Sequence, residues 1–227
     1  MARPTWKSWH LLTLVSIFAR GALAAPTAAP TGPSAIPTGP QYTIIDDYSD
    51  QWKLNGGWGT YGRSEDNYCA PNACLVQPDR TKAHAGTWSE ASAAGASATL
   101  SFNGTGASIY LVCPGKIPLP DGGVAIFSGE FTFAIDGVDA GSWSITDNAG
   151  CENYVYSVRV FERAGLSKAS HTFTITNGGS GASDLLLDFA VVDTGAGTTT
   201  TSPPTTSTTT TSSEPTTTGK CWLCGTY

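Results

Sequence analysis

The sequence predicts an all-β protein, an antiparallel β-sandwich with jelly-roll topology. Three observations lead to this prediction. Charged residues make up only 13% of the 227 residues, while 26 residues are Gly. Several short segments alternate between apolar and polar residues, and no long segment carries the 3.6-residue period of an amphipathic helix. Short strands joined by Gly-rich turns are typical of β-sandwiches and barrels.

The expected strands lie between Tyr42 and Asp193. Residues 131–135 alternate and run into Asp136-Gly137, a dipeptide typical of tight hairpins, and residues 142–145 form the expected return strand. The other expected strands are residues 98–102 with their hairpin partner 107–112, residues 154–161, residues 171–176, and residues 185–192. The last of these is apolar enough to be a buried strand.

The two ends of the chain differ in composition from this central region. Residues 1–24 combine positive charge at Arg3 and Lys7, an apolar stretch over 11–19 and a small-x-small site ending at Ala24. This pattern is typical of a cleaved secretory signal peptide, and nine apolar residues are too few for a membrane span of about 20. The sequence therefore predicts a secreted protein, and no other stretch is long and apolar enough to span a membrane.

The rest of the chain divides into four expected parts. Residues 25–40 are rich in Pro, Ala and Thr and predict an extended linker. Residues 41–194 are the expected β-sandwich domain, and 195–219 a stalk rich in Thr, Ser and Pro whose composition is typical of O-glycosylation. Residues 220–227 form a short tail that contains two Cys.

The charge balance excludes one class of partner. The net charge is −6, and removal of three bases with the signal peptide leaves 9 bases (12 − 3) against 18 acids, or −9. A nucleic-acid-binding protein needs a basic face to neutralise phosphates, so a nucleic-acid partner is not expected.

Six Cys remain after cleavage of the signal peptide, at positions Cys69, Cys74, Cys113, Cys151, Cys221 and Cys224. An even number of Cys in a secreted chain predicts disulfides, but six allow about 15 pairings. The pairing favoured here is Cys69–Cys74, Cys113–Cys151 and Cys221–Cys224. A zinc or redox role for the last pair remains an alternative, although no second close Cys pair or thioredoxin-like context accompanies it.

A series of weak motifs runs in a familiar order through the domain: residues 44–47, Trp52, 56–58, 84–88, 95–102, 104–110, 135–137, 165–166, 171–176 and 187–191. This order resembles fungal secreted or single-pass surface proteins whose ectodomain looks like a galactose-binding jelly roll. The pattern of the final strand is also similar to that of several carbohydrate-binding modules. The resemblance covers most of residues 42–193, outside an insertion around 69–80.

The signal peptide, the sandwich pattern, the stalk and the lack of catalytic residues together favour a non-catalytic module at the fungal cell wall or cell surface that binds a cell-wall glycan, another extracellular glycan or another partner. Two alternatives remain open. One is a structural or adhesive spacer without a sugar site. The other is the ectodomain of a single-pass sensor, because many relatives continue beyond the stalk into a transmembrane helix.

The expected ligand site is the loop from Trp58 to Asn67. Sugars present C–H faces that pack on aromatic rings, and their hydroxyls need polar partners. This loop offers Trp58 and Tyr61 together with Arg63, Asp66 and Asn67. For Trp58 and Tyr61 a ligand role and a core role are equally open.

Two further Trp residues, Trp52 and Trp88, are expected in the core rather than at a ligand, because large aromatic side chains are usually buried.

The resemblance also implies a structural calcium ion, since similar modules place an acid of the first strand near an acid of the last. The matching positions are Asp46 or Asp47 and Asp188. Calcium takes six to eight oxygen ligands, which paired carboxylates and carbonyls supply. Asp188 lies within an apolar run, where an unpaired carboxylate is costly. A hydrogen-bond network or an outward orientation of Asp188 would relieve that cost equally well.

Asn103-Gly104-Thr105 is an N-glycosylation sequon in an expected turn. The same Asn also suits a turn simply because Asn tolerates left-handed backbone conformations.

Enzymatic motifs are missing from the sequence. There is no Gly-x-Ser-x-Gly elbow, and only His84 and His171 would remain after signal cleavage. A glycosidase would need two carboxylates at a defined separation, and the sequence does not pair the candidates Glu90, Glu130, Asp147 and Glu152. The sequence therefore predicts that the chain is not an enzyme.

Overall fold

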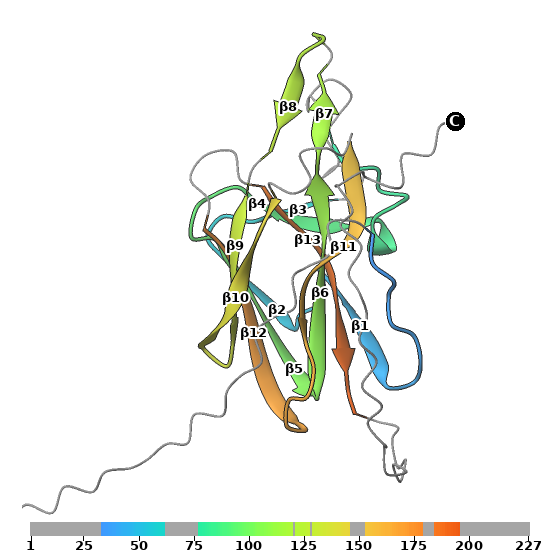
Figure 1. Ribbon diagram of the computed structural model, residues 1–227, viewed down its shortest axis with the longest axis vertical. Helices are drawn as coiled ribbons and strands as arrows, with labels where there is room; N and C mark the ends of the chain where they lie inside the picture. The colour runs from blue at the N-terminus through green and yellow to red at the C-terminus, as the bar shows by residue number, and fades with distance from the viewer. Residues whose placement is uncertain are drawn as a thin grey trace, which may run out of the picture.

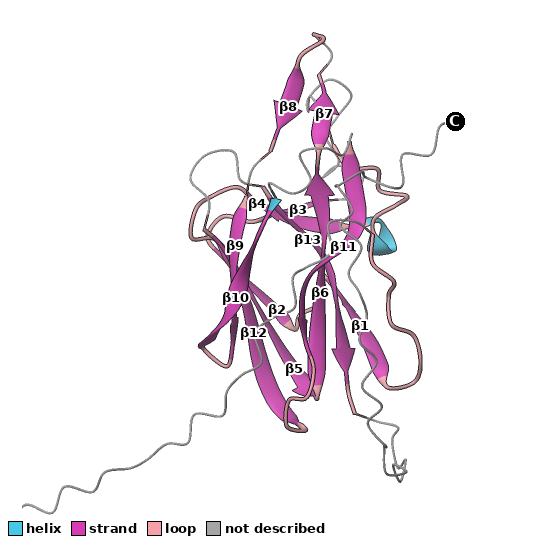
Figure 2. Ribbon diagram, viewed as in Figure 1, coloured by secondary structure: helices cyan, strands magenta, loops and turns pink. Residues whose placement is uncertain are grey.

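The computed structural model describes residues 33–61, 77–119, 121–127, 129–145, 153–178 and 184–195. Within these ranges the chain is almost entirely β-structure, with a short 3₁₀ turn at His84–Gly86 (Figure 2). The strands are β1 (Tyr42–Asp46), β2 (Trp52–Asn55), β3 (Gly59–Tyr61), β4 (Trp88–Ala91), β5 (Ser97–Gly104), β6 (Gly106–Pro114), β7 (Lys116–Pro118), β8 (Val124–Ile126), β9 (Glu130–Ile135), β10 (Val138–Ser144), β11 (Tyr154–Arg163), β12 (Ala169–Asn177) and β13 (Leu185–Asp193).

The strands form two antiparallel sheets that pack face to face as a jelly-roll β-sandwich (Figure 1). The six-stranded sheet has the order β11-β6-β13-β4-β3, and β1 also pairs with β13. The five-stranded sheet has the order β10-β9-β12-β5-β2. The small β7–β8 hairpin extends beyond one end of the sandwich (Figure 1). The predicted fold class is thus confirmed.

Strand β13 changes its partner half-way along its length. Its first part, Leu185 to Leu187, pairs with β4, and its second part, Phe189 to Asp193, pairs with β1. The register with β6 on its other side shifts between Leu187 and Phe189. Asp188 is therefore the residue at which β4 gives way to β1, and this gap in the sheet determines the surroundings of its side chain.

The core between the sheets is rich in aromatic side chains. The rings of Phe133, Phe161 and Phe173 pack together, with centroids 4.8 Å apart for Phe161–Phe173 and 5.1 Å for Phe133–Phe161. Alternation along each strand sends one set of side chains into this core, as the period of two requires. Trp52 lies in this core, and Trp88 lies in a separate buried cluster, with 6% and 2% of their surfaces exposed, as the core interpretation expects.

One predicted hairpin is wrong. β5 and β6 follow each other in the sequence, but β5 pairs with β2 and β12, whereas β6 belongs to the other sheet. The chain crosses between sheets at Gly104–Thr105–Gly106. A Cβ atom at Gly104 would lie 2.3 Å from the carbonyl oxygen of Asp193, so this crossing requires glycine. The Gly-rich signal therefore marked a close approach of backbones rather than a tight turn.

The β9–β10 hairpin is confirmed, with register Val138 to Ile135. Its turn holds Asp136 at φ 51° and Gly137 at φ 74°. Left-handed conformations at both turn residues are those of the hairpin turn that Asp-Gly favours.

The expected signal peptide, residues 25–32 of the linker, residues 196–219 of the stalk and the tail lie outside the described residues. Residues 33–40 of the linker are described, and the N–H of Ser34 donates to the carbonyl of Ser157 on β11 (3.0 Å). No helix in the described part of the chain has the length and apolar character needed to cross a membrane.

Candidate functional site

The topology brings the three predicted acids together. Asp46 ends β1, Asp47 follows it, and Asp188 lies where β13 passes from β4 to β1. The N–H of Asp47 donates to the carbonyl of Asp188 at 3.1 Å. The hydroxyl group of Thr87, directly before β4, contacts the carboxylates of Asp46 and Asp47. Asp46, Asp47 and Asp188 are named here the acid cluster.

Hydroxyl groups bind the carboxylate of Asp47. Thr87 Oγ1 donates to Asp47 Oδ1 at 2.8 Å, and Ser89 Oγ donates to Asp47 Oδ2 at 2.7 Å. Thr87 Oγ1 also lies 3.4 Å from Asp46 Oδ2. Both oxygens of Asp47 therefore have a hydrogen-bond donor, and its side chain is only 3% exposed.

Asp188 is bound less completely. Its Oδ1 atom accepts a hydrogen bond from the backbone N–H of His84 at 2.9 Å, while its Oδ2 atom is buried without a partner. The ring of His84 packs on Phe189, with centroids 4.8 Å apart. The residue is 0% exposed beneath the His84–Gly86 turn. A buried carboxylate oxygen without a partner is costly, so something must compensate it.

Burial dominates the electrostatics of the acid cluster. It raises the pKa of Asp47 to about 7 and that of Asp188 to about 7, and it also raises the pKa of Asp46. The negative charges of Asp46 and Asp47 raise the pKa of Asp188 further. A proton or a cation would relieve this repulsion equally.

The donor atoms of the acid cluster are of the kind that calcium takes. All its side-chain donors are oxygens, and the orphaned Oδ2 of Asp188 fits a cation. Within the described residues, however, no group of three or more His, Cys, Asp or Glu side chains converges as a metal-binding set. Calcium binding by Asp46, Asp47 and Asp188 therefore stays a prediction.

Trp58 of the predicted ligand loop packs against the core and is half-buried. Its indole Nε1 donates to the carbonyl oxygens of Asn55 and Ser97, each at 3.1 Å. Tyr61 ends β3, opposite Trp88. Arg63, Asp66 and Asn67 lie outside the described residues, so the ligand loop stays a prediction.

The other predicted sites are placed in part. Asn103 is exposed near the end of β5, which leaves its side chain accessible for glycosylation. Cys113 is buried in β6. Cys69, Cys74, Cys151, Cys221 and Cys224 lie outside the described residues, and the disulfide pairing stays a prediction.

A second group of residues lies on the outer face of the six-stranded sheet. Along β6 and β13, Val112 and Leu186 point away from the core that their neighbours enter, and they pack with Trp88 of β4. The half-buried rings of Tyr154 and Tyr156 on β11 pack against this outer cluster. Glu90 shares the outer face with Trp88 because the two residues are two apart on β4.

Glu90 and Asp184 carry negative charge to this face. Burial raises the pKa of Glu90, and the carboxylate of Asp184 raises it further. Burial also raises the pKa of Asp184. The pKa of Tyr154 is raised by burial first and then by the charges of Glu90 and Asp184. Glu90, Tyr154, Tyr156 and Asp184 are named here the tyrosine–carboxylate surface.

A neighbouring segment contacts this surface at one side. The hydroxyl of Tyr156 accepts a hydrogen bond from the backbone N–H of Asp79. The ammonium group of Lys82 lies 5.9 Å from the centroid of the Tyr156 ring, within cation–π range. Tyr156 is thereby held in place, and Tyr154 lies beside it at the start of β11.

Sequence reasoning missed the tyrosine–carboxylate surface. Its signal was the alternation of Tyr154 and Tyr156, but their partners belong to β4 and to the residue before β13. Only the strand order β11-β6-β13-β4 brings these positions to one face.

The chain is similar to known proteins in its fold, through matches to solved structures. No family model matches the chain, and no curated protein matches it. Among solved structures, the Agl-KA catalytic domain matches with a TM-score of 0.43 and 13% identity over 74% of this chain and 29% of that chain. The CBM36-1 domain of a multidomain xylanase from the hindgut metagenome of Trinervitermes trinervoides matches with a TM-score of 0.40 and 9% identity over 66% of this chain and 94% of that chain.

An exo-beta-1,3-galactanase from Phanerochaete chrysosporium matches with a TM-score of 0.41 and 13% identity over 68% of this chain and 30% of that chain. The chain thus spans 29% and 30% of the length of the Agl-KA domain and the galactanase. The similar structures are carbohydrate-binding or carbohydrate-active domains.

These comparisons correct one prediction. The sequence predicted that the chain is not an enzyme. That prediction is wrong, because the similar structures include the catalytic domains of Agl-KA and of a GH87 alpha-1,3-glucanase and a two-domain esterase active on acetylated mannans. The fold is compatible with either a binding or a catalytic role.

Proposed function

We propose that the chain is an extracellular carbohydrate-binding β-sandwich and that the tyrosine–carboxylate surface contacts the glycan. One observation carries the proposal: two half-buried tyrosine rings lie on the outer face of the six-stranded sheet with two carboxylates close enough to raise the pKa of Tyr154. Rings offer a stacking face to the C–H groups of a sugar, and carboxylates accept hydrogen bonds from its hydroxyls.

The charge of the surface favours a neutral glycan. The negative charge of Asp184 raises the pKa of Glu90, and the charges of both carboxylates raise the pKa of Tyr154. An acidic sugar would add a further negative charge to this repulsion. Sugar hydroxyls would instead donate to both carboxylates without adding charge.

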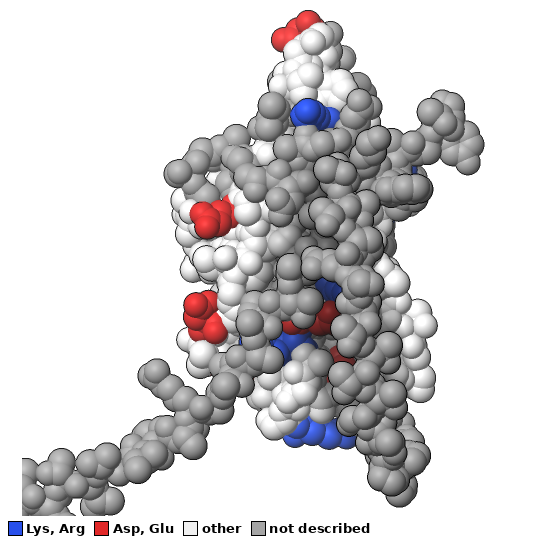
Figure 3. All heavy atoms as spheres, in the orientation of Figure 1, with Lys and Arg blue, Asp and Glu red and all other residues white. Residues whose placement is uncertain are grey.

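The extracellular location rests on the signal peptide expected over residues 1–24. The stalk over 195–219 would hold the domain at the cell wall or cell surface. On the face drawn in Figure 3, the acidic and basic side chains of the described residues lie in small separate groups, whereas a nucleic acid needs a basic face.

The acid cluster would support this function as a structural site. A calcium ion held by Asp46, Asp47 and Asp188 would be the positively charged partner that the buried Oδ2 atom of Asp188 lacks. Its place between β1, β4 and β13 would join the start of the domain to its last strand.

A binding test uses the full secreted chain on a panel of immobilised neutral polysaccharides, including fungal wall glucans. We expect selective binding to one class. Tyr154→Ala should weaken that binding by about tenfold, equivalent to about 1.4 kcal/mol, because the stacking ring is lost. Tyr154→Phe keeps the ring and should retain most of the affinity.

The matched control is Tyr42→Ala, which removes another half-buried tyrosine that packs on the outer face of the same sheet. It should leave binding unchanged. Absence of binding by the folded wild-type chain to every polysaccharide would contradict the proposal and favour a structural spacer or a sensor ectodomain.

A second candidate function is glycan hydrolysis, favoured by the raised pKa of Glu90. A carboxyl group whose pKa is raised is suited to act as a general acid beside a second carboxylate, here Asp184. Release of reducing ends from a bound polysaccharide, abolished by Glu90→Gln, would establish this activity. Binding without product release would leave the chain as a binding module.

A further inference from the structure

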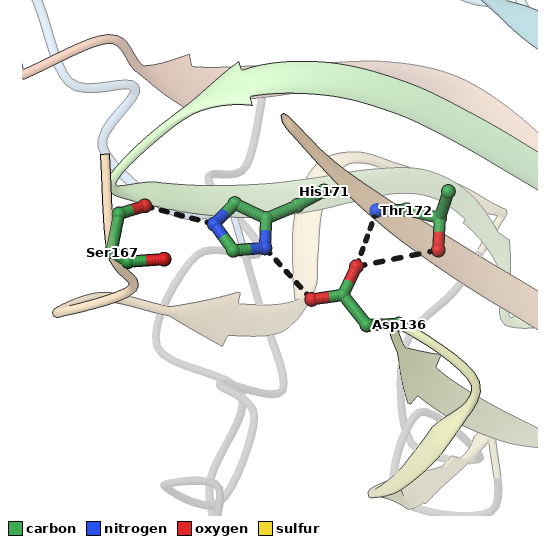
Figure 4. A network of polar contacts seen from close by, with 4 residues as sticks. All are labelled: Asp136, Ser167, His171 and Thr172. Atoms are coloured by element: carbon green, nitrogen blue, oxygen red, sulfur yellow. Dashed lines mark hydrogen bonds and ion pairs between the residues drawn. The ribbon is translucent and has the colours of Figure 1, made fainter. Parts of the chain in front are cut away.

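The side chain of His171 on β12 bridges the β9–β10 turn and the loop between β11 and β12 (Figure 4). Its Nδ1 atom lies 2.7 Å from Asp136 Oδ2 in the β9–β10 turn. Its Nε2 atom lies 2.8 Å from the carbonyl oxygen of Ser167 in the loop between β11 and β12. The side chain of His171 is 8% exposed, so water has little access to either nitrogen.

Both partners of the ring are acceptors. A carboxylate and a backbone carbonyl have only lone pairs to offer, so each ring nitrogen must donate a proton to form its hydrogen bond. A neutral imidazole carries one N–H and one lone pair, and either tautomer would set that lone pair against an oxygen. Only the imidazolium form satisfies both contacts.

We propose that His171 is a charged latch: as an imidazolium it fastens the β9–β10 turn and the β11–β12 loop to strand β12, and loss of one proton opens the latch. This device is independent of the glycan-binding proposal, because it uses none of the residues of the tyrosine–carboxylate surface.

Among the described residues that contact the ring of His171, one is charged. Asp136 faces the ring from the β9–β10 turn, whereas the β11–β12 loop offers the carbonyl oxygen of Ser167. Lys168 of the same loop directs its ammonium group to the carbonyl of Gly195, at 3.4 Å. From β5, the ring of Phe102 packs on His171 with centroids 5.7 Å apart. The imidazolium is thus matched by a single carboxylate.

Asp136 is itself held in place by more than the histidine. Its Oδ1 atom accepts a hydrogen bond from the backbone N–H of Thr172 at 2.8 Å, and its own N–H donates to the carbonyl of Thr172 at 2.8 Å. The residue also adopts φ 51°, a left-handed conformation that is uncommon outside Gly. The latch therefore secures a hairpin turn that the bonds to Thr172 already order.

The directions in which the pKa values of His171 and Asp136 shift agree with this geometry. The hydrogen bond to the Ser167 carbonyl and then that to Asp136 raise the pKa of His171 above its ordinary value. Burial acts to raise the pKa of Asp136, but the hydrogen bonds from His171 and Thr172 outweigh it and lower that pKa. A histidine whose pKa is raised on folding stabilises the fold fully below its unfolded pKa and loses that contribution as the pH rises through its folded pKa.

The direct test is an NMR titration of the ring nitrogens of His171 in the full secreted chain. We expect both nitrogens to be protonated at pH 6.5 and the pKa to lie above the ordinary value of about 6.5. A ring nitrogen without a proton at pH 6.5, or a pKa at or below the ordinary value, would overturn the proposal. This measurement needs no variant, so a folding defect cannot obscure it.

Two variants test the latch itself. Asp136→Asn should lower the pKa of His171, while the matched control Asp139→Asn, an exposed carboxylate on β10, should leave it unchanged. The melting temperature of the wild type should exceed that of His171→Gln by a margin that shrinks as the pH rises from 5 to 9. An equal margin at every pH would mean that His171 acts by packing alone, and would overturn the latch.

Discussion

The backbone N–H of Asp47 donates to the backbone carbonyl of Asp188 at 3.1 Å, and this bond joins the end of β1 to the point where β13 leaves β4. The two carboxylates are therefore neighbours because of sheet topology, although they are far apart in the sequence. Burial raises the pKa of both carboxylates to about 7, because a charged carboxylate is costly away from water.

Calcium is expected to stabilise this junction. If calcium binds only the folded chain, a concentration 100-fold above its dissociation constant raises the free energy of unfolding by about 2.7 kcal/mol. The melting temperature should therefore rise with calcium and fall after EDTA. Asp188→Asn removes a carboxylate without changing its shape and should abolish the calcium-dependent rise.

The control for this experiment is Asp50→Asn, an exposed acid in the turn after β1, which should keep the full response to calcium. A wild-type melting temperature unaffected by both calcium and EDTA would contradict the calcium prediction. The acid cluster would then be a protonated hydrogen-bonded network.

Trp58→Phe is expected to lower stability. The substitution keeps an aromatic ring but removes the indole N–H that donates to the carbonyls of Asn55 and Ser97. Loss of these bonds should lower the free energy of unfolding by about 1–2 kcal/mol, as measured by chemical denaturation. Glycan affinity should be unchanged if Trp58 is structural. A large loss of affinity in a variant that is as stable as the wild type would instead show that Trp58 contacts the ligand.

The sequence allowed the fold class and several strands to be predicted because alternation and Asp-Gly turns are local signals. The β9–β10 hairpin depends on Asp136-Gly137, and β13 on its apolar run. Strand partners were harder to predict. The crossing at Gly104 has the same composition as a hairpin turn, and only the contact with Asp193 distinguishes the two.

The candidate sites, like the strands, could be predicted only in part. Asp46, Asp47 and Asp188 could be grouped from a family resemblance, and the structure places them together. The partnership of Tyr154 with Glu90 and Asp184 could not be predicted, because it depends on the order of four strands in one sheet. The two acceptors of His171 were equally hidden, since one is a backbone carbonyl.

Gly104→Ala is expected to destabilise the domain severely. Its Cβ would lie 2.3 Å from the carbonyl oxygen of Asp193 and 3.1 Å from the carbonyl carbon, so backbone must move. Overpacking of this kind costs about 3 kcal/mol. Gly137→Ala is the comparison, because nothing lies within 4 Å of its Cβ and only its φ of 74° is unfavourable. A smaller effect at Gly104 than at Gly137 in thermal unfolding would contradict the crossing as described.

Asn103→Gln is expected to remove one N-linked glycan from the chain secreted by a eukaryotic host. The side chain is exposed near the end of β5, so a glycan can be attached without disturbing the sheet. Mass spectrometry of the intact protein should show the loss, and Asn55→Gln, which lies outside any sequon, should not show it. An identical mass with and without a glycosidase that removes N-glycans would contradict the prediction.

The central claim is that a glycan contacts the tyrosine–carboxylate surface. It is tested most directly by NMR shift mapping with a neutral oligosaccharide of the class that binds in the panel. The account predicts that the largest shifts fall on Glu90, Tyr154, Tyr156 and Asp184, and that they are lost in Tyr154→Ala. Shifts centred on Trp58 and residues 61–67, with the tyrosine–carboxylate surface unaffected, would contradict it.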